Sequence, residues 1–435
     1  MKRRDGWKGK TNPTDREKIQ FDHRIVMGEP PTRLLVVKAA MVRNGGAARD
    51  LMRNLPEISR RFETKFACLN ILDSQRKSIE SLGVEVLCPV RQWEIKGGLW
   101  NEISAKQDRS SKRAWEDLDG IEQAIEWADA IHLTTGAGSM DFISIVPDSK
   151  PLHLHFLESK PGIFDDVNHL NSDGTGLWKA KLVHILQFYH RRRIISSFQK
   201  FKKNHSWIIN ANSKFSASRL RKEYGIEGGV LYPVVDISEF NSNPSIDEKE
   251  TIDRFRSEDI PYVVTVGNMS RFKGVFEALE HVSGCDLDLV VIGGGSSEEN
   301  GKFQKKAKML GVNAQVLSNL TSTEMSAIFR NARAVIGLSH GEAFGLTPIE
   351  AMATGTPPLF VDYGGYTDTI VDKVNGRLLR RGDLDSWAAA FEQVEDQKTR
   401  ESWAMAGTTR IKELGLTPER HVDRLQESVA SIISL

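Results

Sequence analysis

Short apolar runs alternate with amphipathic segments of helical length through two successive parts of the chain. The runs have four to seven residues and are rich in Val, Ile and Leu, which is typical of strands buried on both faces of a parallel sheet. In the first part we predict strands at 33–39, 66–72, 84–87, 130–133, 151–156 and 207–210. In the second part we predict strands at 262–266, 287–292, 314–317, 334–338 and 358–361. The pattern therefore predicts an α/β protein with two consecutive Rossmann-like units.

Polar segments indicate the limits of these units. Residues 236–259 carry mixed charges and contain Asn243-Pro244, so we expect the hinge there. The last residues show apolar positions at helical spacing and predict a helix that can cross back to the first unit. The expected parts are a flexible N-terminal extension at 1–32, a first Rossmann-like domain at 33–255, a second at 256–415 and a C-terminal helix within 416–435.

Composition narrows the classes of function only slightly. The chain has 40% apolar and 27% charged residues, as soluble globular proteins do, and its formal net charge of +1 points to no particular partner. No run has the length of a membrane-spanning helix, and residues 1–32 lack the apolar stretch of a secretory signal. The three cysteines show no C-x-x-C spacing, which favours a reducing compartment and argues against a zinc site. We therefore expect a cytoplasmic protein.

The most informative motif is the stretch 339–355, in which seven residues separate Glu342 from Glu350. Glu342 stands in a glycine-flanked loop after an apolar run, and Glu350 lies one turn into a helix expected to begin near Thr347. Because ligands bind beyond the carboxyl ends of parallel strands, both carboxylates are expected to open on one crevice. Thr347-Pro348-Ile349-Glu350 also matches a capping box, which would make Glu350 purely structural. A capping box does not need the glycines of the same stretch, and this favours a ligand site.

A second group of candidates follows the first two strands of the second part. The loop 266–274 contains Gly267, Arg271 and Lys273 between a strand and a helix. Fixed cations and a helix N-terminus can stabilise an anionic group of a ligand, such as a phosphate. Gly293 begins a run of three glycines after the next strand, where the backbone can approach a ligand closely. In isolation, these features also fit a surface turn with two solvated cations and a flexible glycine turn.

Together, these stretches resemble motifs of the retaining glycosyltransferases of the GT4 type, within glycosyl transferases group 1. Residues 339–355 resemble the E-x7-E signature of that family, with Ala343 in place of the usual glycine. The loop 266–274 resembles G-R-x-x-x-x-K-G, with Asn268 in place of the usual arginine and Arg271 as a candidate substitute. The resemblance covers about residues 33–435. It implies the GT-B architecture, in which two Rossmann-like domains face each other across an interdomain cleft.

The resemblance implies a role for each matching residue of the second part. Glu342 would contact the donor sugar, Glu350 would hold the ribose hydroxyls, and Lys273 with Arg271 would bind the diphosphate. The remaining donor-binding positions are Gly267 and Gly293 beside the nucleotide and the backbone of Phe344, Gly345, Leu346 and Thr347 at the phosphates or sugar hydroxyls.

The first part offers weaker candidates. Gly45 and Gly46 resemble the family's Gly-Gly loop at a helix start, which lines the donor and acceptor pocket, although a plain strand-to-helix turn explains them equally well. His155 ends a predicted strand and resembles the family's histidine near the donor sugar, so we include it among the catalytic candidates. His132 and His153 fit better as buried, hydrogen-bonded histidines. A metal on the H-x-H pair would need a third ligand, and none is evident.

Two further expectations concern metals and membranes. The chain has no convincing D-x-D motif, so we expect a metal-independent reaction without a cofactor. The segment 174–222 has twelve Lys or Arg residues, interleaved aromatic residues and no Asp or Glu. Such a segment can dock on an anionic membrane or hold an anionic acceptor, and it also fits a solvated helix face. We expect peripheral association with the inner face of a membrane, and we do not favour nucleic acid as a partner.

The sequence therefore predicts a retaining glycosyltransferase of hexosyltransferase type. It would move a sugar from a nucleotide diphosphate sugar to an unidentified acceptor, which can be a glycan, a lipid-linked molecule or a small molecule. Two alternatives stay open. A sugar-nucleotide epimerase of the same fold would turn over the donor without an acceptor, and a non-catalytic GT-B-like partner subunit would bind nucleotide without turnover. Intact Glu342, Glu350 and Lys273 argue against the partner subunit.

Overall fold

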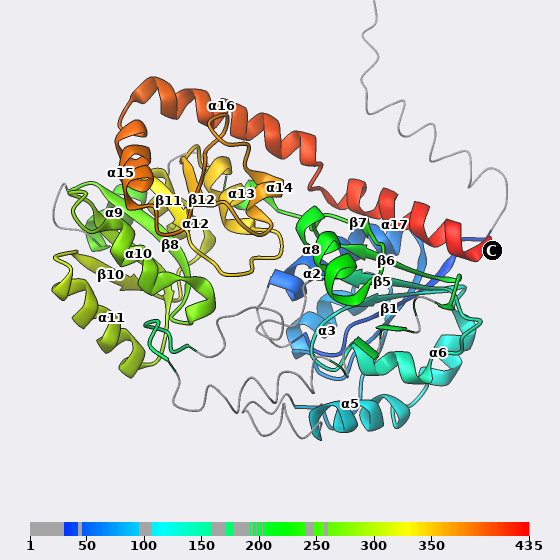
Figure 1. Cartoon of the computed structure of the whole chain (residues 1–435). Helices are drawn as coiled ribbons and strands as arrows, with labels where there is room; N and C mark the ends of the chain where they lie inside the picture. The colour runs from blue at the N-terminus through cyan, green and yellow to red at the C-terminus, as the bar shows by residue number, and fades with distance from the viewer. Residues whose placement is uncertain are drawn as a thin grey trace, which may run out of the picture.

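The computed structural model describes residues 30–41, 46–94, 106–157, 170–176, 203–240, 247–255 and 260–434, and positions 192, 195, 196, 198, 199 and 201 between them. The described strands form two separate sheets, one in each half of the chain. Figure 1 shows the two sheets as the centres of two lobes that lie side by side. The predicted division into two α/β domains is confirmed.

The first sheet has seven described strands in the order β3-β2-β1-β4-β5-β6-β7, and all neighbouring pairs are parallel. The strands are β1 (Arg33–Val37), β2 (Glu63–Ala67), β3 (Glu85–Leu87), β4 (Ala130–Thr134), β5 (Leu152–Phe156), β6 (Trp207–Ala211) and β7 (Gly229–Val230). The helical elements of this half are α2 (Gly46–Arg61), α3 (Asp73–Glu80), α5 (Lys106–Glu116), α6 (Ile121–Trp127), η1 (Met140–Ile145), α8 (Lys214–Arg219), η2 (Leu220–Tyr224) and η3 (Ile237–Glu239).

The second sheet has six described strands, also parallel, in the order β10-β9-β8-β11-β12-β13. The strands are β8 (Tyr262–Asn268), β9 (Asp288–Gly294), β10 (Ala314–Leu317), β11 (Ala334–Gly337), β12 (Pro358–Val361) and β13 (Arg377–Leu379). The helical elements are α9 (Asp247–Phe255), η4 (Arg271–Lys273), α10 (Val275–Val282), α11 (Ser297–Met309), α12 (Ser322–Arg330), α13 (Leu346–Ala353), α14 (Tyr366–Thr369), α15 (Leu384–Gln393), α16 (Gln397–Leu414) and α17 (Pro418–Ile433).

Most predicted strands lie where the structure has them, and the main exception is β2. The apolar run 66–72 largely follows this strand, which begins at Glu63 and alternates exposed and buried positions. Lys65 pairs with Glu85 of β3 at 2.9 Å, so the outer part of the sheet carries charges that a search for apolar runs overlooks. The short strands β7 and β13 were not predicted, because two or three residues carry no readable periodicity.

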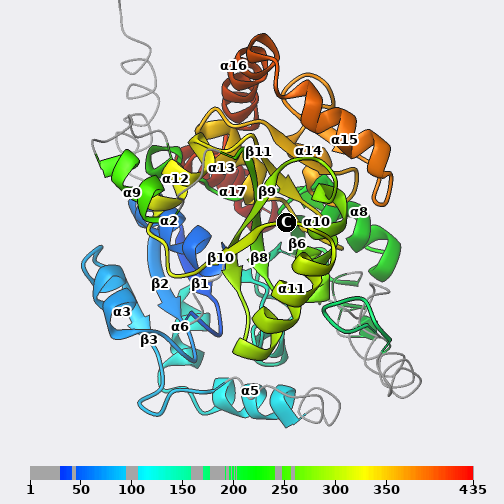
Figure 2. The same ribbon diagram turned by 90° about the vertical axis from the view of Figure 1, so that its left-hand side faces the viewer.

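Two helices cross the expected domain limits. Helix α9 falls within the predicted first domain, but it packs against α12, and Arg330 of α12 contacts Glu248 at 3.0 Å. Helix α17 follows α16 of the second domain and packs on α2, β5 and β6 of the first. Its Val422, Leu425 and Val429 belong to the same buried cluster as residues of α2. Figures 1 and 2 show α16 and α5 at opposite ends of the molecule. The chain therefore returns to complete the first core.

Polar contacts also join the two domains. Asp368 of α14 is buried and accepts hydrogen bonds from the backbone N–H groups of Lys214 and Phe215 at the start of α8, at 3.3 and 3.2 Å. The Tyr232 hydroxyl donates to the same carboxylate at 3.1 Å. An apolar cluster that includes Val235, Phe344 and Leu416 lies beside these contacts. The lobes are thus held by a small apolar contact and a buried acceptor.

Four buried histidines lie where α17 covers the first sheet. The Nδ1 atoms of His132 and His153 are 2.8 Å apart, and His155 Nε2 lies 3.1 Å from the Leu231 carbonyl oxygen. His421 of α17 places its Nδ1 2.7 Å from the Tyr232 carbonyl oxygen. Burial lowers the pKa of each of these histidines, so the folded protein favours the neutral rings.

We expect this cluster to make the protein less stable as the pH falls below about 6.5. The unfolded chain can protonate each histidine there, whereas the folded chain resists it. One pH unit below that point, each histidine that stays neutral lowers the free energy of unfolding by about 1.4 kcal/mol. Urea unfolding between pH 8 and pH 5.5 measures this loss. His155→Gln, which keeps a donor for Leu231, should reduce the pH dependence, whereas the exposed His205→Gln should not. Equal curves for the two variants would contradict the assignment.

Candidate functional site

The strand order of the second sheet reverses between β8 and β11, and the candidate site lies at this point. The loops that follow neighbouring strands at such a reversal leave in opposite directions and open a crevice. Here polar contacts span the two loops. The backbone N–H of His340 donates to the carbonyl oxygen of Phe272 at 2.7 Å, and the Ser339 hydroxyl donates to the same oxygen at 3.1 Å.

Two predicted residues meet between these loops. Lys273 Nζ lies 2.8 Å from Glu342 Oε2, and both side chains are partly buried. Lys273 was predicted to bind a diphosphate and Glu342 to contact a sugar, and in the structure the two side chains form one ion pair. A ligand that used both groups would have to separate the pair or bind around it.

Close backbone approaches explain the glycines of these loops. Gly274 has φ 67°, and a Cβ there would lie 2.1 Å from the Leu338 carbonyl oxygen. Gly293 has φ 137°, and a Cβ there would lie 2.2 Å from the carbonyl oxygen of its strand neighbour Gly267. Both positions therefore require glycine for the fold of the site itself. Direct contact of Gly267 and Gly293 with a nucleotide stays a prediction.

Helix α13 begins one position earlier than expected. Its N-cap is Gly345 with φ 88°, where a Cβ would lie 2.6 Å from the Tyr366 ring. Leu346 and Thr347 are therefore the first helical residues, and neither hydrogen bond of the proposed capping box with Glu350 forms. The capping-box explanation is wrong. The Phe344 side chain is buried in the apolar cluster between the domains, so only its backbone can face a ligand.

Glu350 is a buried carboxylate that faces the first domain. Burial raises its pKa to about 7, while the charges of Arg49 and Arg53 on α2 act in the opposite direction. No hydrogen bond reaches the Glu350 side chain from any residue that the structure describes. The carboxylate therefore keeps its acceptor capacity for a ligand, and carboxyl groups whose pKa burial raises concentrate at functional sites.

The first domain completes the site. A Cβ on Gly46, the first residue of α2, would lie 3.4 Å from Leu346 Cδ1, so the starts of α2 and α13 meet. Gly45 lies outside the described residues. The loop that carries Glu342 is also held by α8 and its N-cap, because the hydroxyls of Ser213 and Ser216 both donate to the Ala343 carbonyl oxygen.

Glu277 positions Arg271, and this residue was not predicted from the sequence. Glu277 of α10 is buried, lies 2.8 Å from Arg271 Nη1 and 2.5 Å from His340 Nε2, and also pairs with Arg381. Burial alone would raise the pKa of Glu277, but the His340 hydrogen bond and the charges of Arg381 and Arg271 outweigh it and lower this pKa. Arg381 donates to the carbonyl oxygens of Leu338 and Ser339 at 2.8 and 3.0 Å. One carboxylate thus orders both loops, and no sequence motif marks it.

A cavity of about 700 Å³ lies beside Arg271, between the two halves of the chain. The segment 170–176 supplies one side, and the loops after β8 and β9 supply the other. Its lining residues are Asn171, Ser172, Asp173, Thr175, Ser270, Arg271, Ser296, Glu298, Glu299 and Lys302. The cavity therefore borders Arg271 and the loop that follows Gly293, and segment 170–176 covers it from the other side.

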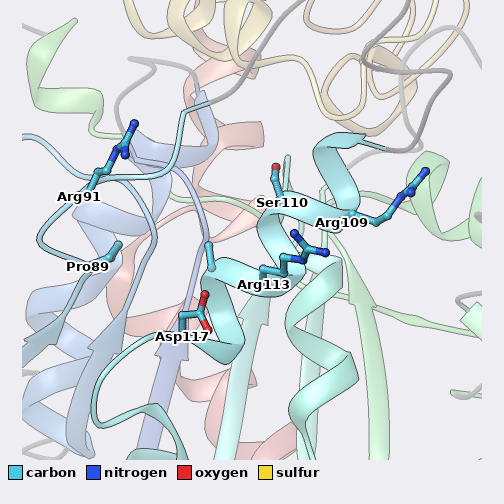
Figure 3. Close-up of a pocket in the computed structure, with 7 residues that line it drawn as sticks. Pro89, Arg91, Arg109, Ser110, Arg113 and Asp117 are labelled. Atoms are coloured by element: carbon cyan, nitrogen blue, oxygen red, sulfur yellow. The ribbon is translucent and has the colours of Figure 1, made fainter.

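A second pocket, of about 520 Å³, lies in the first domain beyond the end of β3 (Figure 3). Arg91 follows β3, while Arg109 and Arg113 project from α5. Asp117 is the only acidic residue among those that line it, so the lining has an excess of positive charge.

The prediction for His155 needs a correction, and the prediction for segment 174–222 stays untested. His155 is only 2% exposed and packs in the histidine cluster under α17, which argues against the predicted contact with a donor sugar. Most of the basic part of segment 174–222 lies outside the described residues, and its association with a membrane stays a prediction. No helix in the described part combines the length and the apolar character needed to cross a membrane.

Comparison with known proteins points to one family for the second half of the chain. Residues 247–410 match the family model of glycosyl transferases group 1. The chain carries a group 1 glycosyltransferase domain. Over 233 residues it is 29% identical to the D-inositol 3-phosphate glycosyltransferase of Nocardiopsis dassonvillei, which covers 49% of this chain and 53% of that protein. The enzyme of the same name from Corynebacterium aurimucosum is 31% identical over 171 residues, or 34% of this chain and 41% of that protein.

Solved structures extend the similarity over both domains. Sucrose-phosphate synthase from Thermosynechococcus elongatus aligns with a TM-score of 0.68 and 13% identity, covering 93% of this chain and 99% of that one. Anabaena HepE in complex with UDP and glucose aligns with a TM-score of 0.64 and 16% identity, covering 92% and 100%. The predicted GT-B fold is confirmed. The sequence similarity covers a smaller part of the proteins than the structural similarity does. The chain spans about half the length of the curated relatives it matches.

We expect Glu277→Gln to destabilise the group 1 domain, because it leaves Arg271, Arg381 and His340 without their shared carboxylate. Loss of one partner from a buried charged network costs about 3–5 kcal/mol. Chemical denaturation at pH 7.5 measures the change. Glu280→Gln on the same helix removes a more exposed partner of Lys306 and should cost less than about 1 kcal/mol. Similar losses in the two variants would mean that Glu277 does not organise the loops.

Proposed function

We propose that the protein is a retaining glycosyltransferase of GT4 type that transfers a hexosyl group from a nucleotide diphosphate sugar to an acceptor. The observation that carries this proposal is the meeting of Lys273 and Glu342 beside the start of α13, with the unpartnered Glu350 one turn further on. Lys273, Glu342 and Glu350 all lie within residues 247–410, which match the group 1 family model. The fold alone would not distinguish a transferase from other enzymes of this architecture.

Each group has a role suited to its chemistry. Glu350 accepts hydrogen bonds from two ribose hydroxyls, which supply the donors that its carboxylate lacks. Lys273, Arg271 and the first backbone N–H groups of α13 stabilise the diphosphate as the bond from its oxygen to the anomeric carbon breaks. Glu342 holds the sugar. The charge of the departing diphosphate partly balances an oxocarbenium-like sugar, which the acceptor hydroxyl attacks on the same face. No side chain is proposed as a nucleophile.

Donor binding and turnover distinguish this proposal from its rivals. A bound nucleotide sugar should raise the apparent stability by about 2.7 kcal/mol at a hundred times its Kd, so thermal unfolding against a panel of nucleotide sugars identifies the donor. A transferase then consumes this donor in proportion to added acceptor. Conversion of the sugar without an acceptor would show an epimerase. Binding without consumption across a broad acceptor set would show a partner subunit.

The arginine-lined pocket of the first domain favours an acceptor that carries an anionic group. Curated relatives that this chain matches are named for D-inositol 3-phosphate, whose phosphate would suit such a pocket. Arg91 and Arg113 are exposed within it, and a phosphate can accept charge-assisted hydrogen bonds from both. We therefore propose a phosphorylated small molecule as the acceptor, and a cytoplasmic location in which such molecules are available.

We expect Glu350→Gln to weaken nucleotide binding roughly 10- to 150-fold, because a hydrogen bond to a charged acceptor is worth about 1.5–3 kcal/mol. Calorimetry with the donor found in the panel measures it. The ligand-free variant should be at least as stable as the parent, since burial disfavours the charged form of this carboxyl group. Thr347→Ala, which changes a neighbouring residue that caps nothing, should alter the stability little. Unchanged nucleotide affinity in Glu350→Gln would refute the ribose assignment.

We expect donor consumption to persist in the presence of EDTA. Lys273, Arg271 and the helix start place positive charge where a divalent ion would otherwise be needed. The described residues contain no group of three or more His, Cys, Asp or Glu side chains arranged to hold a metal ion. Initial rates before and after chelation test this. A collapse that magnesium or manganese restores would replace the metal-free mechanism with a metal-assisted one.

We expect Arg91→Gln combined with Arg113→Gln to raise the KM for a phosphorylated acceptor about tenfold or more, with little change in donor affinity, because the charge-assisted hydrogen bonds are lost. Comparing D-inositol 3-phosphate with free inositol gives the direct measurement. Arg221→Gln changes an exposed arginine of the same domain outside the pocket and serves as the control. Equal use of both acceptors by the parent enzyme would exclude an anionic acceptor.

A further inference from the structure

Two cysteines that are distant in sequence lie side by side at the edge of the first sheet. Strands β2 and β3 are parallel, with Ala67 opposite Leu87, so the next residues in register are Cys68 and Cys88. The backbone N–H of Cys68 donates to the Leu87 carbonyl oxygen at 3.0 Å, which continues the pairing to this point. Neighbouring strands lie about 4.8 Å apart, within the Cα separation that a disulfide can bridge.

The two thiols have different surroundings. Cys68 is fully buried, whereas Cys88 is partly exposed and packs against the same apolar cluster. Arg76 of α3 donates from Nη1 to Cys88 Sγ at 3.4 Å and is itself held by Glu80 at 2.8 Å. A guanidinium beside a partly exposed thiol is the environment of a reactive cysteine.

The electrostatics place the negative charge on Cys88. The hydrogen bond from the Cys68 thiol and the Arg76 charge lower the pKa of Cys88 to about 6, although burial and the charges of Glu80 and Asp73 act in the opposite direction. The same hydrogen bond and burial raise the pKa of Cys68, so this residue keeps its proton. Because Cys88 is also the more exposed thiol and lies beside Arg76, we assign Cys88 as the nucleophile and Cys68 as the second thiol.

We propose that Cys68 and Cys88 form a redox-active pair in which a peroxide oxidises Cys88 and Cys68 then closes a reversible disulfide. In the first step, the Cys88 thiolate attacks one oxygen of hydrogen peroxide, the O–O bond breaks, and hydroxide leaves, which gives the sulfenic acid. In the second step, the Cys68 sulfur attacks Cys88, the S–O bond breaks, and the hydroxyl leaves as water with the Cys68 proton. The two thiols and one peroxide give one disulfide and two waters.

The position of the pair connects its redox state to a pocket of the first domain. Pro89 and Arg91 follow Cys88 directly and line the arginine-rich pocket. A disulfide at Cys88 would tie the start of this loop to β2. The chemistry of the pair itself does not depend on the proposed glycosyl transfer.

The test treats the reduced full-length protein with limiting hydrogen peroxide and maps its tryptic peptides by mass spectrometry. We expect a disulfide between peptides 66–76 and 78–91 that dithiothreitol removes. In Cys68→Ser, a sulfenic acid should accumulate on Cys88 and be trapped by dimedone. In Cys88→Ser, Cys68 should stay reduced. Absence of the linked peptides from the parent protein would overturn the proposal, whatever the variants do.

Cys285 provides a control within the same molecule. It is half-buried, burial raises its pKa, and it lies in the second domain. At pH 7 we expect Cys88 to react with peroxide about tenfold faster than Cys285. Arg76→Gln should slow Cys88 several-fold and move the midpoint of its pH–rate profile upward, while leaving Cys285 unchanged. Equal rates for the two cysteines, or an unmoved profile, would remove the basis for a reactive pair.

Discussion

The reversal of strand order between β8 and β11 is the constraint on which the site depends. No crossover helix can cover both sides of this point, because the chain leaves the two strands toward opposite faces of the sheet. The polar backbone of the exposed loops must then find partners in the gap. Phe272 accepts hydrogen bonds from His340 and Ser339, and Arg381 binds the carbonyl oxygens of the β11 loop. Glu277 supplies the buried negative charge that holds Arg271 of the β8 loop and Arg381, which follows β13.

The first domain completes this crevice through contacts made late in the chain. Asp368 binds the start of α8, and the Ala343 carbonyl oxygen accepts hydrogen bonds from Ser213 and Ser216. The chain then passes from α16 to α17, whose apolar face joins the cluster of α2. Helix α2 also carries Arg49 and Arg53, whose charges act on Glu350. The helix on which α17 packs therefore also positions charges at the site. Packing and electrostatics are coupled through one helix.

The sequence predicted the features that regular patterns or a family motif encode. Buried parallel strands read as apolar runs, and Lys273 and Glu342 were found because a loop and a helix start carry recognisable residues around them. Glu277 was missed because a single buried acid on an amphipathic helix looks like any other. His155 was misplaced because both faces of a parallel sheet are covered, so strand alternation cannot tell a residue under α17 from one at the cleft. The capping box failed because Gly345 adopts φ 88° and starts α13 earlier.

The two glutamates of the motif meet different physical conditions, and this difference bears on how a ligand would be selected. Glu342 is neutralised by Lys273 at 2.8 Å, so a sugar hydroxyl gains its hydrogen bond only against an existing ion pair. Glu350 has no donor among the described residues, and its burial raises its pKa to about 7. A ligand that offers hydroxyl donors to Glu350 would stabilise a carboxylate that burial disfavours. A ligand that offers a diphosphate to Lys273 would instead replace Glu342 as the anion beside this lysine. Under the proposed assignment, the net gain would be largest for a molecule that does both, because its phosphate would take over the Lys273 charge and release Glu342 for the sugar. A free sugar or an isolated phosphate can satisfy only one side of this exchange.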